Sequence, residues 1–347
     1  MQTSFLPGTP DLPLVVQPEG DKSPAALMGW LNSHRQWLED NLLNYGGLLF
    51  RGFEIRTADD FQQVASAVAP KFVDYTRGAS PRNKVQGKVY TSTEAPRSVP
   101  IALHCELSYV DNYPDRICFF CETPPGHGGQ TPIADMRKVY LALDPNVRRR
   151  FEERGLRLIQ NVPAVKSRLN YRTWQEMFAT EDKAEVDRLC AAQGIAPRWK
   201  PDGTLQIINN RPATIQHPRS GETIWFNSAH NSHDSWSWEF RHAGRLLLSL
   251  FVRLIERRRR RRLKPEDFPN HCTFADGGEI PREDIEHIRQ TLWDQAVLFA
   301  WQAGDVLVLD NLRISHGRMP FRGPRRILVA MGSSTADEAA ATGAGAA

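Results

Sequence analysis

The chain has 347 residues, of which 41% are apolar and 24% charged, and this composition is that of an ordinary globular protein. The formal net charge of +4 is too small an excess to indicate a nucleic-acid-binding protein. Five cysteines in so long a chain do not predict a disulfide scaffold. There is no signal-peptide pattern near Met1 and no run of 18 apolar residues. We therefore expect a cytoplasmic protein that contacts neither nucleic acid nor a membrane, and nothing here fixes its oligomeric state.

The first 70 residues predict helices and short strands. A strand is expected over 12–16, within a Pro-rich arm. Ser23, as an N-cap before Pro24, begins a helix, and apolar residues at helical spacing continue it as far as Gly46. The next predicted elements are a buried strand over 48–50 and a helix over 57–69 that begins at a Thr cap.

From residue 89 onward, short β runs separated by Gly and Pro dominate the pattern. Strands are expected over 116–122, 130–134, 296–301 and 304–309. Helical spacing interrupts the strands over 138–155, 174–194, 235–262 and 282–293. Many short strands with helices outside them predict an antiparallel sandwich or barrel with helical insertions.

Two distant segments carry side chains that suit a metal. His104 and Glu106 stand two positions apart in the apolar run 101–109, and in an extended strand such residues point to the same face. His316 follows the buried strand V-L-V-L at 306–309. Alone, each histidine has an ordinary explanation as an edge-strand or loop residue. Together, two imidazoles and one carboxylate form the ligand set typical of non-haem Fe(II) oxygenases.

Four motifs, in this order, resemble the taurine dioxygenase/clavaminate synthase superfamily. They are H-C-E-L-S-Y at 104–109, G-G-Q-T at 128–131, G-E-T-I-W-F-N at 221–227 and the segment 299–332. Within the superfamily they most resemble the branch typified by the syringomycin-pathway amino-acid hydroxylase. The similarity extends from about Pro24 to Ser334, which is nearly the whole chain.

The resemblance implies a mainly β fold, with a double-stranded β-helix (jelly-roll) core flanked by α-helices. We accordingly expect a single oxygenase domain over 1–334, with helical insertions at about 138–194 and 235–293. The tail at 335–347 is rich in Ala, Gly and Thr and is expected to be disordered.

The resemblance also implies Fe(II), with 2-oxoglutarate and O2 as cosubstrates. The superfamily's iron ligands map onto His104, Glu106 and His316. The residues that hold the distal carboxylate of 2-oxoglutarate map onto Thr131 and Arg326. A planar, permanently charged guanidinium suits that carboxylate. Arg325 is the second choice, because neighbouring residues of a strand point to opposite faces.

Two positions separate this chain from particular relatives. Taurine dioxygenase has a second Arg four residues after the Arg that binds its cosubstrate. This chain has Ala330 at the corresponding position, so we do not favour a sulfonate substrate. Halogenating relatives replace the carboxylate ligand with a small residue. Glu106 is present, which favours oxygen insertion.

By analogy with this branch, we expect hydroxylation at the β-carbon of an amino acid, either free or tethered to a carrier protein, in natural-product biosynthesis. The same cofactor chemistry can also desaturate, epoxidise or close rings. Tyr109, Trp225 and Asn227 are candidates to line the substrate pocket, and each is equally well explained as a packing residue.

Three alternatives stay open. The chain could be a jelly-roll binding protein without catalysis, or a zinc hydrolase, although hydrolysis has no evident use for G-G-Q-T and the arginine pair at 325–326. The six arginines at 257–262 could meet an acidic carrier protein. A simpler explanation is that they are solvated and complement the dipole at the end of a helix.

Overall fold

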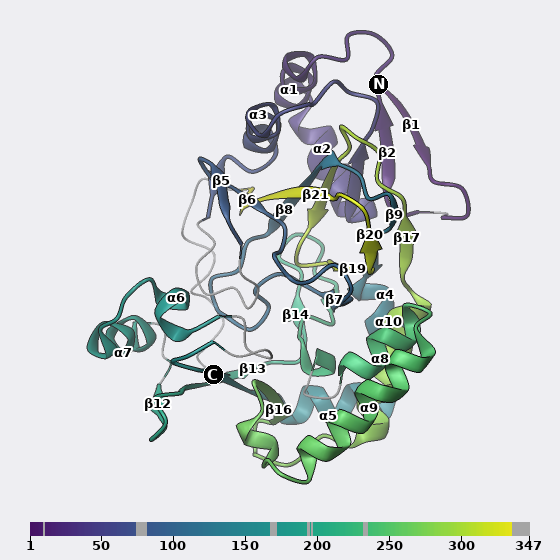
Figure 1. Ribbon diagram of the computed structural model, residues 1–347. Coiled ribbons are helices and arrows are strands. Elements are labelled where there is room, and N and C mark those ends of the chain that lie inside the picture. Colours follow the sequence, from purple (N-terminus) through teal and green to yellow (C-terminus); the bar gives the residue numbers. More distant parts are fainter. Residues whose placement is uncertain are drawn as a thin grey trace.

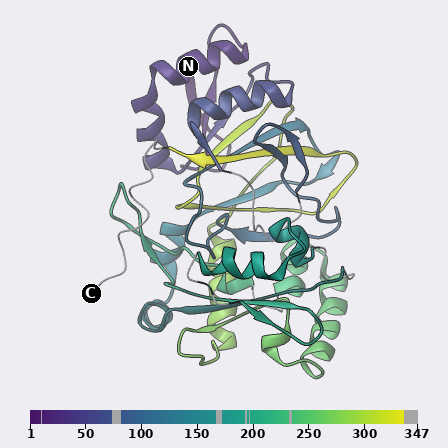
Figure 2. The same ribbon diagram turned by 90° about the vertical axis from the view of Figure 1, so that its left-hand side faces the viewer.

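The computed structural model describes residues 1–9, 11–73, 82–166, 172–192, 195, 197–231 and 235–334. The tail at 335–347, which we expect to be disordered, lies outside the described residues. The described chain forms sheets with helices outside them (Figure 1). Figure 2 shows the strands in the middle, with α1, α2 and α3 on one side and α8, α9 and α10 on the other.

The largest sheet has the order β1-β2-β3-β18-β8-β21-β6-β5, and β4 also pairs with β21. Its strands are β1 (Gln2–Phe5), β2 (Leu14–Gln17), β3 (Gly47–Phe50), β4 (Lys71–Phe72), β5 (Lys84–Gln86), β6 (Val89–Thr91), β8 (Arg116–Thr123), β18 (Val306–Asp310) and β21 (Arg326–Ser333). The central strands are apolar on both faces because both faces are covered. In β18, Val306 and Val308 face the outer helices, whereas Leu307 and Leu309 face the second sheet.

The second sheet has the order β17-β10-β19-β7. Its strands are β7 (Ile101–His104), β10 (Thr131–Asp135), β17 (Val297–Phe299) and β19 (Ile314–Arg318). The two sheets share one apolar cluster, in which Ile133 and Ile314 of the second sheet meet Phe119 and Val329 of the first. The molecule is therefore built around a two-layer sandwich of sheets. Strands β18 and β21 lie in the middle of the first layer, and β19 lies in the middle of the second.

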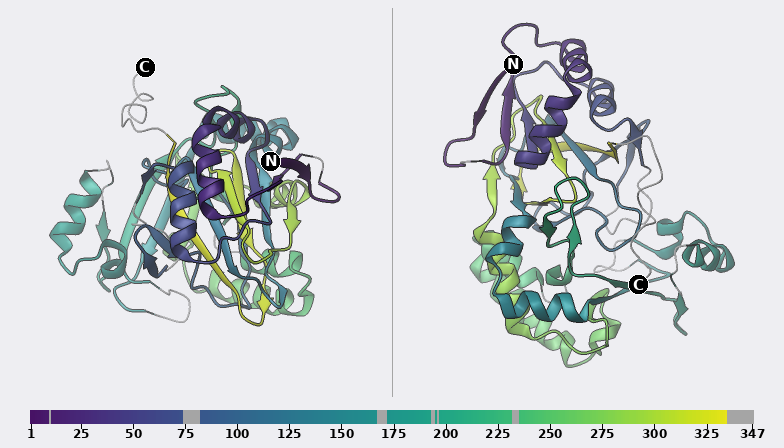
Figure 3. Two further views of the ribbon diagram at one scale, coloured as in Figure 1. Left: turned by 90° about the horizontal axis from the view of Figure 1, so that it is seen from above. Right: turned by 180° about the vertical axis from the view of Figure 1, so that it is seen from behind.

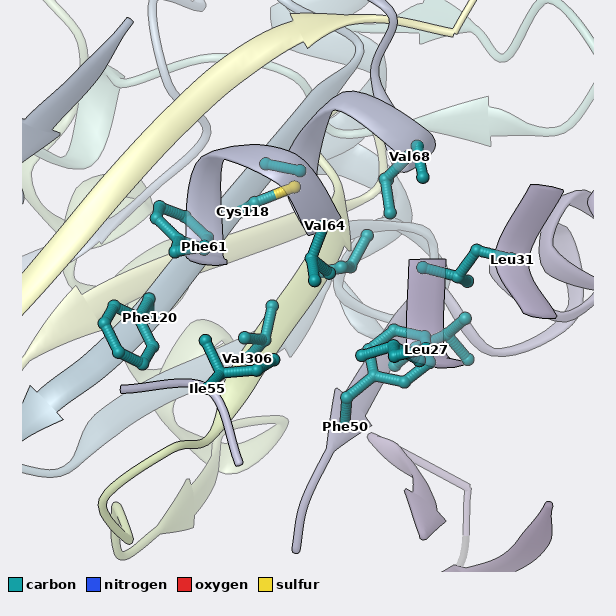
Figure 4. Close-up of a cluster of buried hydrophobic side chains, with 14 of the residues drawn as sticks. Leu27, Leu31, Phe50, Ile55, Phe61, Val64, Val68, Cys118, Phe120 and Val306 are labelled. Atoms are coloured by element: carbon teal, nitrogen blue, oxygen red, sulfur yellow. The ribbon is translucent and has the colours of Figure 1, made fainter. Parts of the chain in front are cut away.

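Helices α1 (Pro24–Ser33), α2 (Arg35–Tyr45) and α3 (Ala58–Val68) cover the outer face of the large sheet. Figure 4 shows Leu27, Phe61 and Val64 from these helices converging on Phe120 and Val306 of the sheet. The single helix expected after Ser23 is in fact two, α1 and α2, which meet at His34.

Local signals fix where these helices begin and end. The Ser23 side chain accepts a hydrogen bond from the Ala26 N–H at 3.2 Å, which caps α1. Thr57 and Asp60 form a reciprocal capping box at the start of α3. Helix α2 ends at Gly46, which has a φ of 75°. A Cβ there would lie 2.4 Å from the Ile314 side chain, so both conformation and space require glycine.

The segments expected to be helical insertions also contain strands, which is a difference from the sequence-based expectation. Strands β12 (Arg198–Trp199), β13 (Leu205–Arg211), β11 (Leu156–Val162) and β16 (Asn270–Phe274) pair in that order to form a third sheet. The helices of this half are α4 (Met136–Ala142), α5 (Pro145–Arg154), α6 (Trp174–Phe178), α7 (Lys183–Ala191), α8 (Ser235–His242), α9 (Leu246–Arg260) and α10 (Arg282–Asp294). Figure 3 shows α6 and α7 on the side of the molecule opposite α8, α9 and α10.

Short elements complete the described chain. They are β9 (His127–Gly128), β20 (Phe321–Arg322), β14 (Ile215–Gln216), β15 (Thr223–Ile224), η1 (Ala229–Asn231) and η2 (Pro265–Asp267). All five cysteines are free and buried, as expected for a chain without a disulfide scaffold. Cys118 and Cys121 belong to clusters on opposite faces of the large sheet, so they do not form a metal site together. Across the ranges that the structure describes, no helix has the length and apolar character needed to cross a membrane.

Candidate active site

His104, Glu106 and His316 come together between the two sheets. Each offers a ligand atom, and these three atoms lie within 4.8 Å of one another. His104 on β7 is the direct antiparallel partner of His316 on β19, and their ring centroids are 4.5 Å apart. The distance from His316 Nε2 to Glu106 Oε2 is 3.8 Å. The pairing of two strands thus places two imidazoles and one carboxylate around a common point.

Backbone irregularities on both strands shape this group. The pairing of β19 with β7 shifts register between His316 and Arg318. A Cβ at the intervening Gly317 would lie 2.6 Å from the Ile101 carbonyl oxygen, so only glycine permits this close approach. On the other strand, β7 ends at His104, and Glu106 lies in the following turn. The carboxylate therefore comes from a turn and not from the continuous strand that the sequence pattern predicted.

Asn311 holds the turn that carries Glu106. The Glu106 N–H donates to Asn311 Oδ1 at 2.7 Å, and Asn311 Nδ2 donates to the Glu106 carbonyl oxygen at 3.0 Å. The same Nδ2 donates to the Pro114 carbonyl oxygen at 2.7 Å. Leu107, the residue after Glu106, has a φ of 57°, a left-handed conformation that is unfavourable for a leucine. Three hydrogen bonds from one buried amide thus stabilise a strained turn beside the carboxylate.

The donor chemistry of this group fits a divalent iron ion. His104 Nδ1 lies 2.8 Å from the Ala102 carbonyl oxygen, which can only accept, so Nδ1 donates and Nε2 is the nitrogen that is available to a metal. Burial, followed by the nearby His104 and Arg82, holds the pKa of His316 well below its usual range, so this imidazole is neutral. Its buried Nδ1 has no hydrogen-bond partner within the described part of the chain. Neutral imidazoles and a carboxylate are the forms that a metal requires.

Arg82 supplies a positive charge next to the carboxylate, and sequence reasoning missed it. Its Nη2 donates to Glu106 Oε2 at 2.5 Å, and both side chains are buried. A guanidinium and a carboxylate at this distance form a charge-assisted hydrogen bond. Arg82 stands far from the metal motifs in sequence, in a stretch without periodicity, so no local signal could have identified it.

Thr131 lies in the sandwich near the start of β10, where it is 4% exposed. Its hydroxyl oxygen accepts a hydrogen bond from Trp301 Nε1 at 2.9 Å, so the hydroxyl proton can be donated to another group. Arg325 lies close by, since its Nε donates to the carbonyl oxygen of Gly129, two residues before Thr131, at 3.3 Å. Burial, with the neighbouring Arg318, lowers the pKa of Arg325 to about 9, so it is a cation at neutral pH.

The placement of Arg326 corrects the prediction made from the sequence. Arg326 is exposed at the start of β21, and its Nη1 pairs with Glu122 Oε2 at 2.6 Å on the outside of the sheet. The physical reason is the alternation at the start of the strand: Ile327 belongs to the cluster inside the sandwich, so its neighbour Arg326 points outward. Arg325 precedes β21, and its own side chain reaches the Gly129 carbonyl oxygen. The residue given as the second choice is the one whose side chain reaches the segment just before Thr131.

The three candidates for the substrate pocket lie in different surroundings. Trp225 is fully buried in the cluster between the second sheet and its helices, where it packs against Phe151. The Asn227 side chain donates to the Ala213 carbonyl oxygen and accepts from the Ala229 N–H, so its polar groups serve the local backbone. These contacts favour a structural role for Trp225 and Asn227 over the role in lining the substrate pocket for which they were candidates. Tyr109 is half-buried, at the end of the turn that carries Glu106.

His230 is hydrogen-bonded to the backbone of β7, the strand that carries His104. Its Nε2 donates to the Leu103 carbonyl oxygen at 2.7 Å, immediately before His104. Burial lowers the pKa of His230 to about 4, so it is a neutral structural residue. His233, also near the W-F-N motif, lies outside the described residues.

Comparison with known proteins agrees with this geometry. The family described as "Taurine catabolism dioxygenase TauD, TfdA family" matches residues 5–331. The dapdiamide synthesis protein DdaC of Enterobacter agglomerans is 34% identical over 324 residues, which cover 93% of this chain and 92% of that protein. A clavaminate synthase-like protein of Arabidopsis thaliana is 30% identical over 308 residues, which cover 87% and 86%.

One solved structure illustrates the shared fold. It is PvcB, described as an Fe, alpha-ketoglutarate dependent oxygenase from an isonitrile synthetic pathway, with a TM-score of 0.51 at 15% identity over 95% of this chain and 94% of that one. The family match spans nearly the whole chain and includes every residue of the His-Glu-His group. The chain therefore belongs to the TauD, TfdA family of dioxygenases and is an enzyme that uses iron and 2-oxoglutarate.

Proposed function

We propose that the protein hydroxylates an sp3 C–H bond, at the β-carbon, of an amino acid or of an aminoacyl unit tethered to a carrier protein, in natural-product biosynthesis. The observation that carries this proposal is the grouping of His104, Glu106 and His316 inside the sandwich, near Arg325 and Thr131. Two histidines and one carboxylate leave positions on iron open for the cosubstrate and O2.

Each residue of the site has a role in this proposal. His104, Glu106 and His316 hold Fe(II). The bound iron and 2-oxoglutarate supply oxygen activation coupled to decarboxylation of the keto acid. Arg325, with Thr131, holds the distal carboxylate of 2-oxoglutarate, and this role moves from Arg326 because Arg326 faces solvent and pairs with Glu122. Arg82 holds the ligand carboxylate through a charge-assisted hydrogen bond, and Asn311 positions the backbone that carries it.

We further propose that the two facing sheets form the family's double-stranded β-helix, or jelly roll, within a single domain over 1–334. The support is the sharing of one apolar cluster by the two antiparallel sheets and the family match over 5–331. We also place the enzyme in the cytoplasm, because its five cysteines are all free, which suits a reducing compartment.

The substrate class is supported by the similar proteins. DdaC is a dapdiamide synthesis protein, and PvcB belongs to an isonitrile synthetic pathway, so both are named for the synthesis of small natural products. The same motifs led us to expect the branch of the syringomycin-pathway amino-acid hydroxylase. Ala330, in place of a second arginine, favours a substrate without a sulfonate. Desaturation, epoxidation or ring closure on a related small molecule would use the same site residues.

An anaerobic titration tests the cofactor assignment in this chain. Fe(II) is added to the purified protein, followed by 2-oxoglutarate, and the visible charge-transfer absorption is recorded. We expect a band that grows with 2-oxoglutarate, is absent in His104→Ala and is unchanged in the control His34→Ala, at the exposed junction of α1 and α2. Circular dichroism confirms that each variant is folded. No band in folded, iron-loaded protein would refute the assignment.

The substrate proposal has its own assay. Succinate formation is measured aerobically with free amino acids and with aminoacyl carrier proteins, and the products are identified by mass. We expect an amino-acid substrate to gain one oxygen atom per succinate formed. A loss of two hydrogen atoms instead would identify a desaturase. Stimulation only by substrates unrelated to amino acids would reject the substrate class while leaving the cofactor assignment intact.

A further inference from the structure

A second concave site lies between α8, α9 and α10, away from the His-Glu-His group. The three helices, green in Figure 1, form one side of the molecule. The cavity has a volume of about 200 Å³, which exceeds the roughly 30 Å³ occupied by one water molecule in the liquid. Its lining is dominated by charged side chains from all three helices: Ser237, Trp238, Arg241, Ser249, Arg253, Glu256, Arg257, Arg260, Arg282, Glu286 and Arg289.

The cations of this cavity outnumber its anions. Its lining contains six arginines and two glutamates. Both glutamates already have hydrogen-bond donors, since Glu256 accepts from the N–H and hydroxyl of Ser237, and Glu286 accepts from Arg282. Burial, together with the charges of Arg282 and Arg289, lowers the pKa of Arg260, which shows that these guanidiniums repel one another. A concave site with excess positive charge concentrates anions.

The arrangement of the arginines favours one kind of anion. Arg253, Arg257 and Arg260 lie three or four residues apart and therefore on one face of α9. Arg241 approaches from α8, whereas Arg282 and Arg289 approach from α10. Guanidiniums on three sides match the several oxygens of a tetrahedral dianion better than one planar carboxylate. We propose that this cavity binds a phosphate group, either as inorganic phosphate or as part of a small phosphomonoester.

The deepest arginine of the cavity also contacts the support of the metal strand. Arg289 is 3% exposed, and its Nε donates to the His230 carbonyl oxygen at 2.8 Å. His230 in turn donates to the Leu103 carbonyl oxygen, next to His104. A phosphate that contacts Arg289 would therefore be linked, through two successive hydrogen bonds, to the backbone of β7, the strand that carries His104. The site is separate from the active site and connected to it through the buried η1 segment.

Calorimetric titration with inorganic phosphate tests the proposal on the full chain, in chloride buffer at constant ionic strength. We expect saturable binding that weakens about ten-fold in Arg253→Gln, because one charge-assisted hydrogen bond is lost. Arg257→Gln should show a similar loss. The matched control is Arg258→Gln, an exposed arginine on the same helix that does not line the cavity, and its affinity should equal that of the wild type. Arg253 and Arg257 are exposed, so these variants should fold.

Two further ligands identify the source of the phosphate group. Glycerol 3-phosphate that binds more tightly than inorganic phosphate identifies an organic phosphate, and equal or weaker binding identifies free phosphate. Both outcomes support the cavity as a phosphate site. Succinate that binds as tightly as phosphate and loses the same affinity in Arg253→Gln would overturn the proposal in favour of carboxylates. Equal affinities in Arg253→Gln, Arg257→Gln and Arg258→Gln, or no saturation up to roughly 10 mM phosphate, would overturn it entirely.

Discussion

Arg325 and Arg326 are adjacent in sequence and lie in opposite surroundings. Arg325 is half-buried and donates to the Gly129 carbonyl oxygen, whereas Arg326 is exposed and pairs with Glu122. A charged partner in a buried site contributes far more than a pair that water and salt can screen. The two arginines therefore form a natural pair of variants for locating the cosubstrate carboxylate.

We expect Arg325→Ala to weaken 2-oxoglutarate binding by roughly 30-fold or more, the equivalent of about 2 kcal/mol for a lost buried charge partner. Arg326→Ala should leave this affinity within about two-fold, because its ion pair is on the surface. The 2-oxoglutarate dependence of the charge-transfer band measures both variants. A larger loss in Arg326→Ala than in Arg325→Ala would show that the outward placement of Arg326 does not describe the working enzyme.

The residue types and their order in the sequence were enough to name His104, Glu106 and His316, which the structure brings together. Two histidines and one carboxylate seldom occur by chance at the positions of a family motif. The residue types and their order were not enough to choose between Arg325 and Arg326, since that choice depends on the phase of strand alternation set by Ile327. Trp225 and Asn227 stood in a family motif, yet tertiary packing and backbone hydrogen bonds use their side chains. No single-sequence pattern reports such partners.

At the scale of elements, the turn between β7 and the following loop determines where Glu106 points. It is joined to the turn after β18 by Asn311, whose amide contacts the backbone of Glu106 on both its N–H and its carbonyl sides. Residues that orient a ligand without touching the metal commonly change metal affinity by about 10- to 100-fold when removed. Asn311 is in this sense a positioning residue.

Asn311→Ala should therefore lower Fe(II) affinity by about ten-fold or more and destabilise the protein by roughly 2–4 kcal/mol through unsatisfied buried groups. The matched control is Asn161→Ala. Asn161 lies on β11 of the third sheet, and its buried amide donates to the Glu266 and Phe268 carbonyl oxygens. This control should lose similar stability and keep wild-type iron affinity. Iron titration and chemical denaturation separate the two effects, and equal iron affinities in both variants would limit Asn311 to a structural role.

Helix starts were predictable because Ser23 and Thr57 carry their signal in three or four consecutive residues. The third sheet was not predictable in the same way. Its strand β11 pairs with both β13 and β16. In the pairing with β16, Leu156 stands opposite Phe274, which is over one hundred residues away in sequence. Pairing over such distances is decided by the complete fold, and the helical spacing of the surrounding segments concealed it.

At the scale of the whole molecule, a buried acid links stability to pH. Burial raises the pKa of Glu239 from 4.5 to about 7, with the nearby Arg289 opposing the shift. Below pH 4.5, the folded and unfolded states both carry the proton. As pH rises from 4.5 through 7, the unfolded chain releases it first, which favours unfolding. The stability that Glu239 contributes is thus complete at low pH and is lost through this window.

We expect the free energy of unfolding of the wild type to fall by about 3 kcal/mol relative to that of Glu239→Gln between pH 4.5 and 8. Glutamine has the shape of the protonated acid and does not titrate. Glu283→Gln, an exposed position on α10, should follow the wild-type curve. Denaturant unfolding at several pH values gives these curves. Parallel curves for wild type and Glu239→Gln would mean that Glu239 is ionised throughout.

The direct pairing of His104 with His316 has a consequence for how the enzyme acquires its metal. The two histidines stand more than two hundred residues apart, so a ribosome synthesises most of both sheets before the second histidine exists. The strand that carries the second must then insert between neighbours already made. Iron loading therefore requires that β19 has paired with β7, and a molecule that retains iron has closed its central sheets correctly. In the cell, metal content would report folding quality before any turnover occurs.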